Sequence, residues 1–157
     1  MTQKISNKTK LIDAILPEVF PSSSENSYTS TTNEIQITVR PEFIDSQFSA
    51  IGNLFIWIYR IRIDNKSNEN AKLVNRYWKI IDEKGVIQEV NGEGVVGEQP
   101  VILADNSYQY ESGVHLRQPS GIMTGHYQMQ KDNGELFDVK IPTFSLDMPS
   151  DTKLIVH

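Results

Sequence analysis

Residues 55–63 of the chain are Phe-Ile-Trp-Ile-Tyr-Arg-Ile-Arg-Ile. Every second side chain in this stretch is large and apolar, and the set consists of Phe55, Trp57, Tyr59, Ile61 and Ile63. The residues between them are apolar at first and become Arg60 and Arg62 toward the end. A period of two is typical of a β-strand, because successive side chains point to opposite faces. We therefore predict a strand that begins buried on both faces and ends with one face in water.

The same alternation recurs along the chain, between turn signals such as Asp82–Gly85 and Asn133–Gly134, and it predicts further strands near residues 35–39, 73–81, 86–90, 107–111, 123–129 and 136–141. We expect a type I′ turn at Asn133–Gly134. Because no helical spacing follows Phe20, the pattern predicts an all-β, immunoglobulin/fibronectin type III-like antiparallel β-sandwich of seven to eight strands. The side chains expected to point inward are Trp57, Tyr59, Ile61, Trp78, Tyr127, Met129, Phe137 and Val139.

The first 33 residues differ in composition from the rest. Residues 11–20 carry apolar side chains at helical spacing, and residues 21–33 are rich in Ser, Thr and Asn. Such a polar stretch buries too little apolar surface to offset its ordering entropy. We predict an N-terminal extension and flexible linker over residues 1–33, the sandwich over residues 34–147, and a tail over residues 148–157. The apolar positions of 11–20 could alternatively anchor the extension on the sandwich or on a partner.

Composition narrows the range of functions. The chain has 157 residues, no cysteine, and a formal charge of −5 from 15 Lys plus Arg and 20 Asp plus Glu. Mild acidity argues against a nucleic-acid partner, since such proteins need clustered Lys and Arg. No apolar stretch is long enough for a membrane span, and no signal peptide is recognised. The absence of cysteine fits a cytoplasmic location and argues against disulfides and thiol nucleophiles.

The segment Val90–Pro100 contains a literal G-x-G-x-x-G at Gly92, Gly94 and Gly97. In dinucleotide-binding proteins these glycines precede a helix, whereas here Glu98, Gln99 and Pro100 lead into another strand-like segment. Glycine-rich backbone amides can hold an anion without a helix, although Glu93 and Glu98 would repel a phosphate. Two interpretations stay open: a structural loop, and a loop that contacts a ligand or partner.

Catalytic and metal motifs are weak. His115, His126 and His157 are too far apart for a local metal motif, and Ser112 and His115 would lie on opposite faces of one strand. No G-x-S-x-G sequence accompanies them. We therefore expect no enzyme activity, no metal and no cofactor.

Several ordered motifs resemble those of the ApaG family, and they lie at residues 76–85, 89–100, 110–113, 121–127 and 137–144. The resemblance extends from about Glu34 to Leu146. It implies a fibronectin/immunoglobulin-like sandwich, in agreement with the strand pattern. It also implies a genetic association with cobalt resistance and magnesium efflux, and a protein-interaction role in related domains of eukaryotic F-box and polymerase-associated proteins. The chain departs from the family pattern at Ala104–Asn106, where a Pro-Gly turn is common, and in its longer N-terminal segment.

We accordingly predict a non-enzymatic binding domain, acting in protein–protein interaction or regulation, with an as yet unidentified protein partner. Val95 and Val96 would offer an apolar contact between the glycines. The alternative is binding of a small anion, such as pyrophosphate or a nucleotide, by the Gly92–Gly97 loop. The predicted contact residues are Arg76, Gly92, Glu93, Gly94, Val95, Val96, Gly97 and Glu98.

Overall fold

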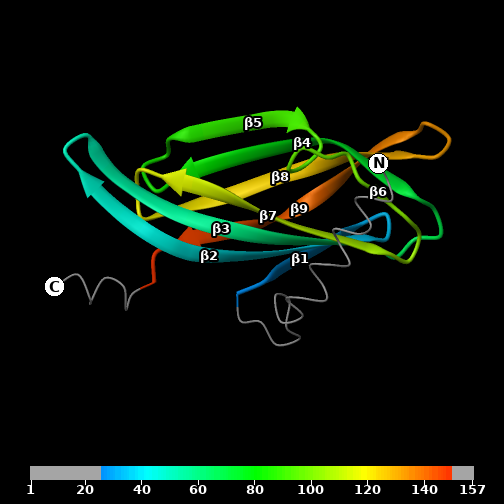
Figure 1. Cartoon of the computed structure of the whole chain (residues 1–157), viewed down its shortest axis with the longest axis horizontal. Helices are drawn as coiled ribbons and strands as arrows, with labels where there is room; N and C mark the ends of the chain where they lie inside the picture. The colour runs from blue at the N-terminus through cyan, green and yellow to red at the C-terminus, as the bar shows by residue number, and fades with distance from the viewer. Residues whose placement is uncertain (1–25, 150–157) are drawn as a thin grey trace.

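The structure, a computed structural model, describes residues 26–149, which form two antiparallel sheets packed face to face (Figure 1). The first sheet has the order β1-β2-β3-β7, with β1 at Tyr28–Thr32, β2 at Ile35–Ser49, β3 at Gly52–Asn65 and β7 at Ser107–Leu116. The second has the order β5-β4-β8-β9, with β6 also paired to β4. Its strands are β4 at Ala71–Asp82, β5 at Ile87–Glu93, β6 at Val101–Ile102, β8 at Ser120–Lys131 and β9 at Leu136–Asp147. The predicted all-β sandwich is confirmed, and residues 26–149 form nine strands instead of the seven to eight expected.

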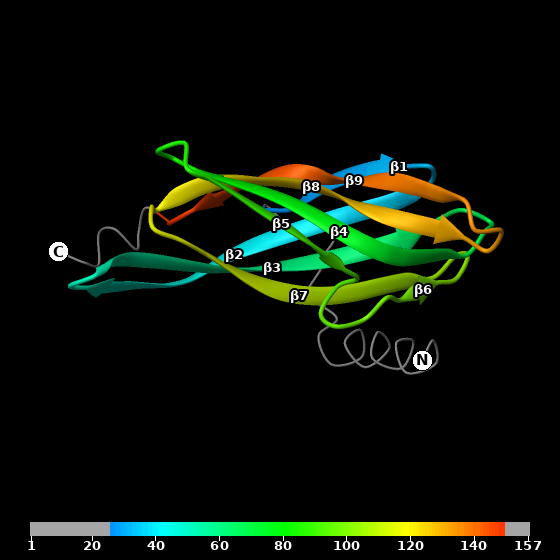
Figure 2. The same ribbon diagram turned by 90° about the horizontal axis from the view of Figure 1, so that it is seen from above.

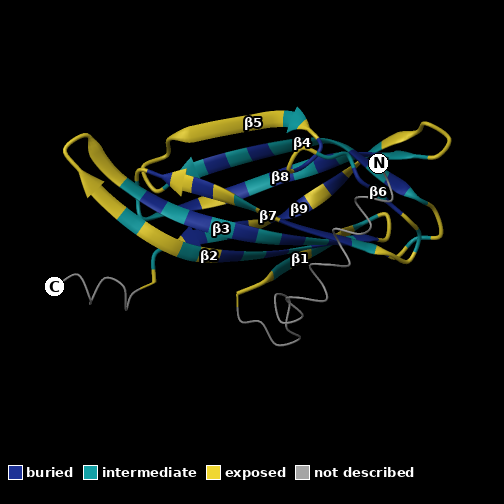
Figure 3. Ribbon diagram, viewed as in Figure 1, coloured by how far each residue is buried: buried dark blue, intermediate teal, exposed yellow. Residues whose placement is uncertain are grey.

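The core lies between the sheets and consists of the alternate side chains that the period of two predicted. Trp57, Tyr59, Ile61, Trp78, Tyr127, Met129 and Val139 are buried. Phe137 packs against the core but is only partly buried. In β3, Ile56 and Ile58 are half-buried and not fully buried, so the expectation of two dry faces at its start is wrong. Figure 3 shows buried and less buried residues alternating along β3 and β8.

The sandwich begins earlier than predicted, at Tyr28 instead of Glu34. Residues 28–32, expected to be linker, form β1, which pairs with β2. Asn33 and Glu34 make the two-residue turn between them with φ of 49° and 65°. Thr suits this strand because its β-branched side chain favours extended backbone, and the Ser and Thr hydroxyls find partners on β9. The Ser30 hydroxyl donates to the Lys140 carbonyl oxygen, at 2.9 Å. The segment 11–20, the rest of the linker and residues 150–157 lie outside the described residues.

Two hairpin turns share one geometry that differs from the type I′ turn predicted at Asn133–Gly134. Gly134 N donates to Lys131 O and Lys131 N to Glu135 O, while Gly134 alone of the loop residues has a positive φ, 91°. This is a type I turn followed by a left-handed glycine, which forms a bulge. Gly85, with φ of 85°, ends the β4–β5 turn in the same way.

The strand β9 closes the sandwich. It pairs with β8, and its backbone also lies beside β1, the outer strand of the opposite sheet. The indole nitrogen of Trp57 donates to the carbonyl oxygen of Asp147 at the end of β9, at 3.0 Å. At the other side of the second sheet, β5 pairs with β4 and lies at the edge, where Figures 1 and 2 show it running along β4.

Candidate functional site

The glycine loop of residues 92–100 contains a tight two-residue turn. Val95 N donates to Glu98 O at 2.8 Å, and Glu98 N donates to Val95 O at 2.9 Å. The two residues between them, Val96 and Gly97, have φ of 44° and 79°. Positive φ at both central positions defines a type I′ turn, for which Asn-Gly is the favoured sequence. The glycine-rich segment therefore contains a hairpin turn with Gly97 in it, and the short strand β6 follows instead of a helix.

A bulge in β4 fixes the base of this turn. The register between β4 and β8 shifts between Leu73 and Asn75, which frees the Val74 carbonyl oxygen to accept from Gly94 N at 2.8 Å and from the Gln99 side-chain amide at 2.9 Å. A Cβ atom on Gly94 would lie only 1.9 Å from Glu98 O. Gly94 is thus required by close backbone packing.

The two valines of the loop have opposite environments. Val95 belongs to the hydrophobic core and is 1% exposed, whereas Val96 is 42% exposed at the tip of the turn. The prediction that both valines offer a surface contact is therefore wrong for Val95. Because the backbone direction reverses at Val96–Gly97, the residue before the turn points into the sandwich and the next one points out.

Arg76 lies beneath the loop on β4. Its Nη1 donates to the carbonyl oxygens of Glu93 and Gly94, each at 3.0 Å. A Cβ atom on Gly92 would lie 2.7 Å from the same nitrogen, so the missing side chain makes room for the guanidinium. The loop thus presents carbonyl oxygens to a cation, while the amides of Gly94, Val95 and Glu98 donate within the protein.

Behind the loop, four tyrosines from both sheets converge in the core, and they are Tyr59, Tyr108, Tyr110 and Tyr127. The hydroxyls of Tyr110 and Tyr127 are hydrogen-bonded at 2.5 Å. Burial raises the pKa of both far above the ordinary value of 10.0, and the nearby Arg76 charge opposes this only in part. The Tyr108 hydroxyl donates to the Glu98 carboxylate at 3.0 Å, and burial together with this carboxylate raises the Tyr108 pKa. Glu98 is thereby held in place from within.

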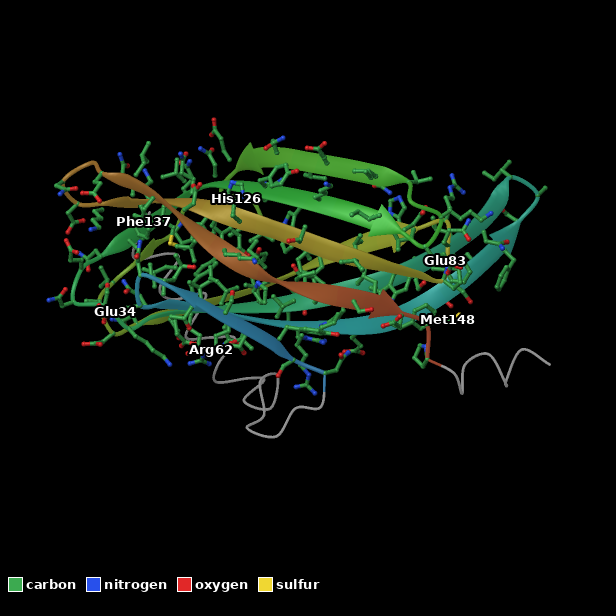
Figure 4. The ribbon with its side chains drawn as sticks, turned by 180° about the vertical axis from the view of Figure 1, so that it is seen from behind. Glu34, Arg62, Glu83, His126, Phe137 and Met148 are labelled. Carbon is green, nitrogen blue, oxygen red and sulfur yellow. The ribbon has the colours of Figure 1, made fainter. Side chains whose placement is uncertain are left out.

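A groove of about 460 Å³ runs across the outer face of the second sheet, next to the loop. The Tyr77 and His126 rings pack with centroids 5.1 Å apart, and the Asn75 side chain donates to Gln128 Oε1 at 2.7 Å. Figure 4 labels His126 on this sheet. The complete lining consists of Asn75, Arg76, Tyr77, Asn91, Gly92, Glu93, His126, Gln128 and Asp138.

Sequence reasoning missed this groove. The sequence does contain a pattern that predicts its lining. Residues that alternate with buried Trp78 and Tyr127 must point outward, and these include Tyr77 and His126. What the sequence does not state is that β4 and β8 are neighbours, with Tyr77 paired to His126.

The residues considered for catalysis are not brought together. Ser112 is half-buried and faces Tyr59, whereas His115 is exposed on the other face of β7. His126 lies on the opposite sheet. Among residues 26–149, the structure has no group of three His, Asp or Glu side chains positioned to hold a metal ion.

Comparison with known proteins places this geometry in a family. The family profile of the ApaG domain matches residues 45–131. The chain belongs to the ApaG family. The ApaG protein of Paramagnetospirillum magneticum is 48% identical over 124 residues, which cover 79% of this chain and 95% of that protein. The ApaG protein of Rhizobium etli is 49% identical over 122 residues, covering 78% and 94%.

A solved structure supports the same assignment. The crystal structure of the putative ApaA protein from Bordetella pertussis matches with a TM-score of 0.68 and 31% identity, covering 81% of this chain and 98% of that one. The family profile and the ApaG relatives confirm the ApaG resemblance inferred from the ordered motifs. Within residues 26–149, the ApaG sandwich has no helix of the length and apolarity needed to cross a membrane.

Proposed function

We propose that this ApaG protein is a non-catalytic binding domain whose turn at Val96–Gly97 contacts a protein partner. The observation that carries the proposal is the conformation of Val96. A β-branched residue with positive φ is strained, and this side chain is nevertheless exposed at the tip of a turn where Asn would fit better. Exposed strain of this kind clusters at functional sites. An apolar side chain that is exposed despite backbone strain is suited to contact with another molecule.

Charge around the turn favours a partner with basic groups. Glu93 is exposed beside the turn, and Glu98 is half-buried with its carboxylate fixed by Tyr108. A carboxylate held in one orientation loses little entropy when it binds a cation. Contact by Val96 with an apolar group, flanked by these two carboxylates, would give the partner a defined orientation.

The substitution Val96→Asn tests the proposal. Asn tolerates the left-handed conformation, so the variant should be more stable by about 1 kcal/mol, with a melting temperature higher by roughly 2–6 °C. Recovery of partner proteins from cell extract by the immobilised domain should nevertheless fall, because the apolar contact is lost. A more stable variant that recovers less partner separates binding from folding.

The matched control is Val86→Asn. Val86 is 57% exposed and lies in the β4–β5 turn, at the far end of β5 from Val96. Its replacement should leave partner recovery unchanged. Equal recovery by wild type and Val96→Asn would refute a contact at this turn.

The alternative function is binding of pyrophosphate or a nucleotide, favoured by the position of Arg76 beneath the loop and beside the groove. We rank it second because Gly94, Val95 and Glu98 amides already have acceptors. Titration with pyrophosphate decides between the two. Shifts confined to the amide resonances of Gly92–Gly97 at micromolar concentration would establish the anion site.

The remaining functional predictions follow from the sequence and the family. We propose that any effect on cobalt resistance or magnesium efflux is regulatory, acting through the bound partner. A cytoplasmic location and the lack of a nucleic-acid partner stay predictions from composition.

A further inference from the structure

We propose that β5 is the docking site for an extended segment of the partner, which adds to the five-stranded sheet as a sixth strand with Lys or Arg at alternate positions. The inference rests on the proposed function, because it specifies which chemistry the protein partner presents. Six of the seven β5 residues are exposed, and Figure 3 shows the exposure along almost the whole strand. Within residues 26–149, β5 pairs with no strand besides β4.

The hydrogen-bond pattern shows which backbone groups of β5 are free to pair. Gly94 N donates to Val74 O, and Asp82 N donates to Val86 O. These two bonds set the phase of the antiparallel ladder, so the backbone groups of Gln88, Val90 and Gly92 point toward β4. The groups that point away from the sheet belong to Ile87, Glu89, Asn91 and Glu93. They form a template for one further strand, and β5 contains neither the proline nor the lysine with which sheet edges are commonly protected.

The negative charge of β5 favours an added strand with basic side chains. The side chains of the outward-pairing residues lie on the outer face of the sheet, the same side as Tyr77, and they include Glu89 and Glu93. The Tyr77 hydroxyl donates to Glu89 Oε2 at 2.9 Å and orients this carboxylate. Lys79 is the β4 residue opposite Glu89 in the register, so Glu89 stands between Lys79 and the free edge of the sheet. Basic side chains opposite Glu89 and Glu93 would complete cross-strand ion pairs.

A second copy of this chain fits the edge poorly. In a symmetric dimer, β5 would pair antiparallel with β5 of a second copy. Glu89 would then lie opposite Glu89 or Glu93 of the other copy, or, in other registers, the four carboxylates of the two copies would still share one interface. Like charges placed opposite each other destabilise a strand pair. On the inner side, Val90 is 38% exposed, so short apolar residues between the basic ones would cover it. The matching segment therefore alternates basic and short apolar residues, as in other complexes formed by strand addition.

The test uses a fluorescently labelled synthetic peptide of alternating Lys and Val, titrated into the full-length protein and followed by anisotropy. Amide hydrogen exchange, measured residue by residue, should show new protection at Ile87, Glu89, Asn91 and Glu93. Gln88 and Val90, already bonded to β4, should not change. A peptide alternating Glu and Val should not bind. Protection that lacks this alternation, or lies outside β5, would overturn the inference.

A pair of variants at Asn91 separates the backbone from the side chain. Asn91→Pro removes an N–H that makes no bond to β4 and places a ring on the free edge, so peptide affinity should fall about tenfold or more. Asn91→Ala keeps the N–H, and its affinity should change less than about twofold. Glu93→Gln should weaken binding and reduce its dependence on salt. Equal affinities of the Pro and Ala variants would contradict strand addition, and if the Pro variant does not fold, the exchange pattern of wild type decides alone.

The two proposals can fail separately. Alternating protection of β5 by the peptide, combined with normal partner recovery by Val96→Asn, would retain the docking edge and refute the contact at the turn. Lower recovery by Val96→Asn without any protection of β5 would retain the contact at the turn and refute the docking edge.

Discussion

At the scale of the residue, the glycine loop contains glycines that are required for different reasons. Gly94 has φ of 58°, and a Cβ atom there would meet Glu98 O at 1.9 Å. Gly97 has φ of 79°, with no atom within 4 Å of its would-be Cβ. Gly97 therefore has only a conformational reason to be glycine, whereas Gly94 also has a steric one.

The two glycines should respond differently to alanine. Gly97→Ala should lower the free energy of unfolding by about 1–2 kcal/mol, the cost of a left-handed alanine. Gly94→Ala should lower it by roughly 2–5 kcal/mol, since the backbone of Glu98 must also move. Urea unfolding of both variants measures the difference. Equal losses would show that the contact between Gly94 and Glu98 is easily relieved.

The sequence predicted which segment forms the loop but not the direction of its side chains. Arg76 alternates with Trp78 and Ile80, which directs its side chain toward the inner face of β4, and the period of two contained this information. The burial of Val95 depends on the reversal at Val96–Gly97. No local pattern revealed that reversal, because Val-Gly is an unfavourable sequence for a type I′ turn.

At the scale of the element, strands with strong alternation were predictable, and β1 was not. Its residues, Tyr-Thr-Ser-Thr-Thr, carry one large apolar side chain, Tyr28, whose ring lies 6.1 Å from that of Phe144. Composition alone indicated a linker. The strand exists because β2 offers a free edge and β9 offers hydrogen-bond partners, and both are tertiary effects.

Truncation should show that β1 is part of the folded domain. A chain that starts at residue 34 lacks β1 and leaves the edge of β2 and one side of β9 uncovered. Its melting temperature should lie more than about 8 °C below that of a chain starting at residue 26, on the order of 2 kcal/mol or more. Calorimetry of the two proteins makes the comparison. Equal melting temperatures would show that β1 does not contribute to the stability of the folded domain.

At the scale of the whole molecule, the sheets are joined by buried phenols as well as by apolar contacts. Tyr110 on β7 and Tyr127 on β8 share a hydrogen bond across the interior. Their pKa values are raised by burial, so the folded protein retains two protons that the unfolded chain releases above pH 10.0, the ordinary tyrosine value. Folding stability linked to these groups is fully present below that pH and is lost as the pH rises further.

Alkaline unfolding should therefore be cooperative and should begin above about pH 10. Each of the two tyrosines contributes up to about 1.4 kcal/mol per pH unit to the decline. Tyrosinate absorbance and circular dichroism, followed in one titration, should show the buried phenols ionising together with the loss of sheet. The paired substitution of Tyr110→Phe and Tyr127→Phe should make the decline less steep. Ionisation of both phenols in the folded protein would contradict their burial.

The closing position of β9 has a consequence for the time during which the protein is synthesised. β9 is the last strand of the sandwich, yet it covers β8, packs beside β1 and accepts the Trp57 indole hydrogen bond at Asp147. Until β9 has left the ribosome, β8 has an open edge and the side of β1 that faces it is bare. Strands whose edges stay unpaired until a partner distant in sequence is synthesised are prone to aggregation. This protein should thus depend on chaperone protection of nascent chains more than a sandwich closed by its early strands.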